Sequence, residues 1–98
     1  MKHRPVIYSD EAGDDLDWIY DAISEVGGPL TASRYEQRIR SFCEGLDYGS
    51  ERGNRRDDIR PGLRIIERRV TVAFIVEPER VVILRIVYGG RNWERDLR

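Results

Sequence analysis

The chain contains one cysteine, Cys43, and one histidine, His3. One cysteine forms no intrachain disulfide, and these two residues cannot fill a Cys/His zinc site, which needs four ligands. Cys43 lies among apolar positions of an expected helix, so we interpret it as a buried structural thiol rather than a nucleophile. These shortages exclude disulfide-framework and zinc-finger proteins.

Long apolar runs and nucleotide-binding motifs are also missing. No apolar stretch approaches the ~20 residues of a membrane span, and the opening MKHRPVIYSD lacks the apolar core of a signal peptide. The sequence contains no P-loop, GxGxxG motif or nucleophile elbow. We therefore expect a cytoplasmic protein with no cofactor, no metal and no membrane contact.

The charge is divided unevenly along a chain of 98 residues, which is the length of a single domain spanning 1–98. Residues 1–50 carry five Lys/Arg against ten Asp/Glu, whereas residues 51–98 carry twelve Arg, no Lys and eight Asp/Glu. Guanidinium groups hold carboxylates or phosphates with two parallel hydrogen bonds, so an acidic partner is one interpretation. The other interpretation is that genome composition favours arginine over lysine.

The first half predicts a short strand and two helices. Residues 5–9 (PVIYS) are typical of a strand, and Ser9 is placed to cap a helix that Gly27–Pro29 ends. A second helix begins at Pro29 or Ser33. The apolar stripe of the first helix is Ala12, Leu16, Ile19, Ile23 and Val26, and that of the second is Tyr35, Ile39, Phe42 and Leu46. The two helices predict an antiparallel hairpin.

The second half changes to the period of two that is typical of strands. After an expected loop over residues 46–58, strands are predicted from Leu63, over Val70–Val76 and over Val81–Tyr88, with a turn at Pro78–Glu79. The predicted fold is α+β, with the order β-α-α-β-β-β and a helical hairpin packed on one face of an antiparallel sheet. The acids of the first helix (Asp14, Asp15, Asp17, Asp21 and Glu25) are interpreted as a solvated face.

Arginines in the predicted strands are the candidate functional residues. If Leu63 and Ile65 face the helices, Arg64 points out of the uncovered face of the sheet. Arg85 interrupts an apolar strand, so it needs either that face or a carboxylate. Tyr88 and Arg91 follow, and the four side chains are predicted to converge on one surface. The alternative is ordinary ion pairing, of Arg64 with Asp57 or Asp58 and of the group with Glu77, Glu79 and Glu94.

Both tryptophans have two interpretations. Trp93 follows the last strand in a polar tail, and packing onto the core is favoured over anchoring a partner. Trp18 lies off the apolar stripe of the first helix, and it is either a half-buried helix edge or part of an interface.

The order of three stretches resembles the ParE branch of the RelE/ParE toxins. These stretches are SDEAGDDLDWIYDAI, DDIRPGLR and VVILRIVYGGRN. The family pattern of an acidic "A..DL..I" helix falls on Ala12, Asp15–Leu16 and Ile19, the "GLR" strand entry on residues 61–64, and the closing "ILRV-[HY]-G-R" strand on residues 83–91. The resemblance covers nearly the whole chain.

The resemblance implies the toxin of a type II toxin–antitoxin pair in a bacterial cytosol. Its partners would be a ParD-like ribbon-helix-helix antitoxin, in a hetero-oligomer, and DNA gyrase or a related topoisomerase, with DNA reached only indirectly. The residues assigned to target binding are Arg60, Arg64, Arg85, Tyr88, Arg91 and Trp93. Those assigned to antitoxin binding are Leu16, Trp18, Ile19, Tyr20, Ile23, Arg64 and Arg85.

Two alternatives accompany this interpretation. One is a RelE-like ribosome-dependent endoribonuclease, with Arg64, Arg85, Tyr88 and Arg91 as its catalytic group; the other is an inactive homologue that only binds the antitoxin as co-repressor. The chain departs from RelE because arginines (Arg52, Arg55 and Arg56) stand where RelE has lysines and the last ten residues contain no tyrosine. These departures favour a topoisomerase poison without an active site of its own.

We predict that Arg64→Ala or Arg91→Ala leaves the fold intact and weakens toxicity, because each removes a charge from the expected acting surface. Growth after induced expression measures the effect, and circular dichroism checks folding. Full toxicity of a stable double variant would rule out these residues as part of the acting surface.

Overall fold

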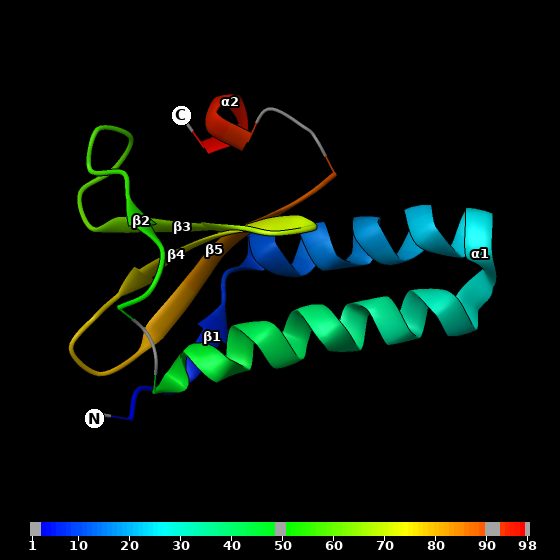
Figure 1. Ribbon diagram of the computed structural model, residues 1–98, viewed down its shortest axis with the longest axis horizontal. Coiled ribbons are helices and arrows are strands. Elements are labelled where there is room, and N and C mark those ends of the chain that lie inside the picture. The colour runs from blue at the N-terminus through cyan, green and yellow to red at the C-terminus, as the bar shows by residue number, and fades with distance from the viewer. Residues whose placement is uncertain (1–2, 49–50, 90–92, 98) are drawn as a thin grey trace.

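The computed structural model describes residues 3–48, 51–89 and 93–97, with the side chains of Trp93 and Asp96 outside that description (Figure 1). The elements in chain order are β1 (Val6–Tyr8), α1 (Asp10–Glu44), the 3-10 turn η1 (Gly45–Asp47), β2 (Asn54–Arg55), β3 (Leu63–Glu67), β4 (Val70–Val76), β5 (Val81–Tyr88) and α2 (Trp93–Leu97). The predicted α+β class is confirmed.

The helix α1 is a hairpin of two arms, as predicted. Its backbone leaves helical geometry at Gly28, which has φ 85° and ψ 165°, and Pro29 follows. Glycine adopts this left-handed conformation without a Cβ clash, and proline suits the first turn of the helix that follows. We call residues 10–27 the first arm and residues 29–44 the second arm. Figure 1 shows the two arms lying antiparallel against one side of the sheet.

The sheet has five strands in the order β1-β5-β4-β3-β2. The antiparallel meander β3-β4-β5 is confirmed, with the predicted turn between β4 and β5. Strand β1 pairs with β5 in parallel, so the first and last strands of the chain lie side by side. The prediction of a plain loop over residues 46–58 was wrong, because η1 extends into this range and the two-residue strand β2 lies within it. Helix α2 was not predicted either.

Apolar side chains form a cluster on each face of the sheet. The larger cluster lies between the sheet and the hairpin, and it contains Leu16 and Ile19 of the first arm, Ile39 of the second and Phe74 of β4. The smaller cluster lies on the opposite face. It consists of Leu63, Ile65 and Ala73, with Ile59, Leu84 and Leu97 packed against it. Helix α2 therefore covers part of the face that was expected to be open.

The apolar stripe of the first arm is buried up to Ile23 and exposed beyond it. Ala12, Leu16, Ile19 and Ile23 are buried, whereas Val26 is 89% exposed. The expectation that Val26 belongs to the buried stripe was wrong, since the turn of the hairpin extends past the sheet (Figure 1). Among the helices of the described residues, none combines the length and apolarity needed to span a membrane.

Alanine substitutions at two glycines should change the stability of the protein in opposite directions. A Cβ on Gly53, which has a φ of 84°, would lie 2.6 Å from the backbone oxygen of Ile65, whereas a Cβ on Gly13 would meet no atom within 4 Å. We expect Gly53→Ala to lower the free energy of unfolding by about 1–3 kcal/mol. Gly13→Ala is the matched control and should raise it by roughly 0.5–1 kcal/mol. Urea denaturation measures both, and equal effects would contradict the strained conformation at Gly53.

Candidate functional site

The start of α1 completes the edge of β5 that β1 leaves open. Strand β1 pairs only with residues 81–83 of β5. Beyond it, the Ser9 backbone N–H donates to the Ile83 carbonyl oxygen at 2.9 Å and the Ser9 hydroxyl donates to the Leu84 carbonyl oxygen at 2.8 Å. The Ile86 N–H donates to Asp15 Oδ2 at 2.9 Å. The cap residue Ser9 and the Asp15 side chain thus satisfy backbone groups that a longer strand would have paired.

Arg85 forms a bidentate ion pair with Asp15. Its Nε donates to Asp15 Oδ2 at 2.7 Å and its Nη2 donates to Asp15 Oδ1 at 2.9 Å. The two side chains are 23% and 14% exposed, respectively, so the pair is largely shielded from water. Arg85 was expected either to lie on the uncovered face of the sheet or to pair with a carboxylate, and the structure shows the carboxylate pairing. That carboxylate belongs to Asp15 of the first arm, so the expectation that Asp15 is solvated was wrong.

Arg64 lies on the hairpin side of the sheet, which corrects the prediction for this strand. Its register partner is Phe74, which belongs to the larger cluster. Leu63 and Ile65 pack instead on the opposite face. Arg64 Nη1 donates to the backbone oxygen of Glu51 at 3.2 Å, which is not the predicted pairing with Asp57 or Asp58.

Tyr88 lies at the far end of the hairpin side. Its register partner is Val70, four residues along β4 from the Phe74 that faces Arg64. Four residues of strand at ~3.3 Å each and two strand spacings of ~4.8 Å separate Arg64 from Tyr88 by roughly 16 Å. Arg85 pairs in register with Ala73, which belongs to the smaller cluster on the face away from the hairpin. The structure therefore does not bring Arg64, Arg85 and Tyr88 together, and Arg91 lies outside the described residues.

The structure does bring Arg60 close to Arg85. Both line a small cavity of about 120 Å³ on the face away from the hairpin, together with Glu11, Leu84 and Leu97. Trp93 begins α2 on the same side, and its side chain is outside the described atoms. Arg60 and Arg85 are the two residues assigned to target binding that line this cavity.

Most of the apolar residues assigned to antitoxin binding are core residues. Leu16, Ile19 and Ile23 are buried against the sheet and the second arm. A partner would reach them only if the hairpin moved, and their role in antitoxin binding stays a prediction. Trp18 is 52% exposed. Tyr20 is partly buried against the core.

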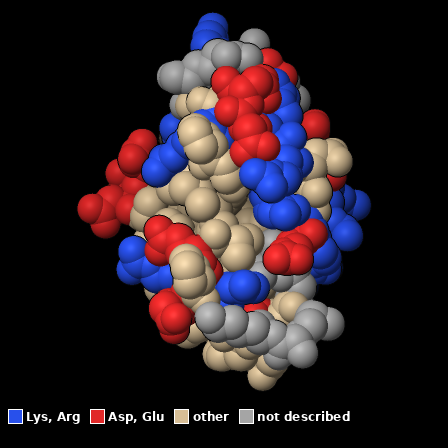
Figure 2. Space-filling view, turned by 90° about the vertical axis from the view of Figure 1, so that its left-hand side faces the viewer, with Lys and Arg blue, Asp and Glu red and all other residues tan. Residues whose placement is uncertain are grey.

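Arginines at the end of the molecule that holds the β2–β3 and β4–β5 connections are paired with acids. Figure 2 shows positive and negative side chains intermixed there. The pairs include Arg55 with Asp57 at 2.9 Å, Arg56 with Asp58 at 2.8 Å and Arg56 with Glu94 at 2.9 Å. Arg56 donates hydrogen bonds to the carboxylates of Asp58 and Glu94, which raise the pKa of Arg56. The arginines of residues 51–98 therefore do not form a uniformly positive surface at this end of the molecule.

Cys43 is confirmed as a buried thiol. Burial raises its pKa to about 12, so it stays protonated near neutral pH and is a poor nucleophile. In the described part of the chain, no three His, Cys, Asp or Glu side chains are grouped as a metal site requires.

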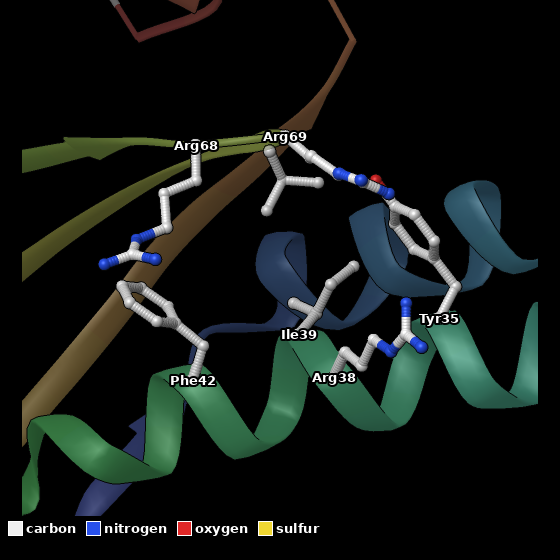
Figure 3. Close-up of a pocket in the computed structure, with 7 residues that line it drawn as sticks. Tyr35, Arg38, Ile39, Phe42, Arg68 and Arg69 are labelled. Atoms are coloured by element: carbon white, nitrogen blue, oxygen red, sulfur yellow. The ribbon is translucent and has the colours of Figure 1, made fainter.

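One concave feature of the surface was not predicted from the sequence. A groove of about 340 Å³ runs between the second arm and the β3–β4 turn, and it is lined by Tyr35, Arg38, Ile39, Phe42, Arg68, Arg69 and Val70 (Figure 3). We call it the arginine-rimmed groove. Ile39 and Val70 are buried at its floor, and the Arg68 guanidinium lies 5.0 Å from the centre of the Phe42 ring. The adjacent Arg68 and Arg69 were the signal in the sequence, but the second arm that completes the groove is distant along the chain.

Comparison with known proteins gives the family. Residues 6–93 match the family described as ParE toxin of type II toxin-antitoxin system, parDE. The chain belongs to the ParE toxin family. Toxin ParE3 of Caulobacter vibrioides is 35% identical over 88 residues, which is 89% of this chain and 88% of that protein. A chain of the chromosomal ParDE TA system from P. aeruginosa superposes with a TM-score of 0.75 at 29% identity, covering 89% of this chain and 97% of that one.

The predicted ParE resemblance is thus confirmed, and two of the motifs that carried it meet in space. Asp15 comes from the acidic helix motif and Arg85 from the closing strand motif. In this ParE chain the two motifs meet in one structural contact between the hairpin and the sheet edge, and the Asp15 and Arg85 side chains are largely shielded from water there.

We predict that Asp15→Ala lowers the free energy of unfolding by about 2–4 kcal/mol, because it leaves the Arg85 guanidinium and the Ile86 N–H without their acceptor. Asp14→Ala is the matched control, since Asp14 is an exposed neighbour on the same helix, and should change stability by less than about 0.5 kcal/mol. Chemical denaturation compares the two variants. Equal stability losses would show that the ion pair contributes nothing beyond an ordinary surface acid.

Proposed function

We propose that this ParE-family toxin acts by binding DNA gyrase or a related topoisomerase, and that a ParD-like antitoxin neutralises it in a cytoplasmic hetero-oligomer. The proposal rests on the family, on the name ParE3 of its relative and on the ParDE system of its structural neighbour. DNA would be reached only through gyrase or the antitoxin.

The scattered arginines are the structural observation that favours binding over RNA cleavage. Cleavage needs a group that activates the ribose hydroxyl and a cation that stabilises the phosphate within reach of one substrate. Arg85 is instead engaged by Asp15, and Arg64 and Tyr88 lie at separate ends of the hairpin side. A binding protein needs no such convergence.

We place the target-binding surface on the face away from the hairpin. Arg60 is exposed there, beside the cavity that Leu84, Arg85 and Leu97 line. An exposed guanidinium next to apolar side chains suits a protein surface that carries acids, because it offers both charge steering and an apolar contact. Arg85 would support this surface through its pair with Asp15 and would not contact the target directly.

We expect the purified toxin to make gyrase linearise supercoiled plasmid, and Arg60→Ala to weaken this activity by tenfold or more. Arg80→Ala is the matched control, since Arg80 is also an exposed arginine but lies on the β4–β5 turn, and it should retain activity. A parallel assay follows mRNA on translating ribosomes. Cleaved mRNA with unaffected gyrase would support the endoribonuclease instead, and the absence of both effects would support the inactive co-repressor.

A further inference from the structure

The first arm exposes an aromatic side chain between acids. Asp14, Trp18, Asp21 and Glu25 are spaced by four, three and four residues, which places them on one face of a helix. All four are exposed, and Trp18 is 52% accessible. Among the described residues, no cation forms an ion pair with Asp14, Asp21 or Glu25. We call these four residues the acidic stripe.

The arginine-rimmed groove has the complementary chemistry. Its floor is apolar, its rim carries Arg38, Arg68 and Arg69, and no carboxylate is among the described residues that line it (Figure 3). Figure 3 shows Arg68 reaching from the β3–β4 turn toward Phe42 and Arg69 reaching toward Tyr35. Such a groove accepts an apolar or aromatic side chain whose neighbours are carboxylates.

Nucleic acid fits this groove less well than protein does. Bases bind to exposed aromatic faces. The Phe42 ring is instead flanked by the guanidinium groups of Arg68, at 5.0 Å, and Arg52, at 5.8 Å. Tyr35 packs edge-on against Tyr88, with ring centres 5.8 Å apart. The aromatic groups of the groove are therefore already engaged, and the apolar floor is left for an aliphatic or aromatic side chain.

The acidic stripe and the groove are neighbours on the surface. Trp18 of the stripe contacts Tyr88, with ring centres 6.4 Å apart, and Tyr88 contacts Tyr35 of the groove. Two complementary patches side by side are what a two-fold symmetric dimer requires, because each patch of one copy meets the other patch of its partner. The molecule carries both halves of such an interface.

We propose that the groove binds the acidic stripe of a second copy of this chain, forming a two-fold dimer with Trp18 inserted between the arginines of the rim. Trp is the residue that most often anchors a protein interface, and the flanking carboxylates would pair with Arg38, Arg68 and Arg69. The same contact forms twice, which doubles the buried surface. Salt screens exposed charge pairs, so the dimer should weaken as ionic strength rises.

Light scattering coupled to size exclusion tests this with the full chain over a range of concentrations. We expect twice the 11.5 kDa mass of one chain at high concentration and a single chain on dilution. Arg68→Glu with Arg69→Glu should raise the dimer dissociation constant by tenfold or more, and so should Asp14→Arg with Asp21→Arg. Arg80→Glu reverses an exposed arginine at the opposite end of β4 and should leave the constant unchanged.

Mixing the two double variants is the decisive measurement. Each alone places like charges opposite one another, but together the reversed groove of one meets the reversed stripe of the other, and the two unaltered patches also match. We expect the mixture to form a dimer with affinity close to that of the original chain. A mixture that stays monomeric, an original chain that is monomeric at all concentrations, or a dimer that the double variants do not weaken would overturn the proposal.

Discussion

The ion pair between Asp15 and Arg85 connects the two halves of the fold. It ties the first arm to β5 at the point where β1 ends, and the same carboxylate accepts the Ile86 N–H. Two charges that are mostly removed from water are stable only when their hydrogen bonds are well satisfied, so the geometry here is demanding. Asp15 therefore fixes where the first arm meets the edge of β5, while the apolar cluster holds the hairpin against the sheet.

Elements with a strong local pattern could be predicted from the sequence. The Ser9 cap, the break at Gly27–Pro29 and the strands Val70–Val76 and Val81–Tyr88 all appear in the structure. The face of β3 could not be predicted, because LRIIE places an apolar residue on each face whichever way it turns. Strand β2 and helix α2 are too short to produce a periodic signal.

The sequence did not show which residues distant along the chain would contact one another. Asp15 looks the same as Asp14 and Asp17 in a run of acids, and only the position of Arg85, 70 residues later, distinguishes it. The groove is likewise made by the second arm and a turn that is distant in the chain. The arginines of the second half were therefore read as one surface, whereas the structure distributes them between an internal pair, surface pairs and the rim of the groove.

The pairing of the first strand with the last has a consequence for synthesis. The Ser9 hydroxyl donates to the Leu84 carbonyl oxygen across 75 residues, and among the described strands β1 pairs with β5 alone. Contacts between distant segments form slowly and only when both segments are present. A nascent chain therefore cannot close this edge of the sheet until β5 has left the ribosome, so β1 waits without its strand partner through most of the synthesis of the domain.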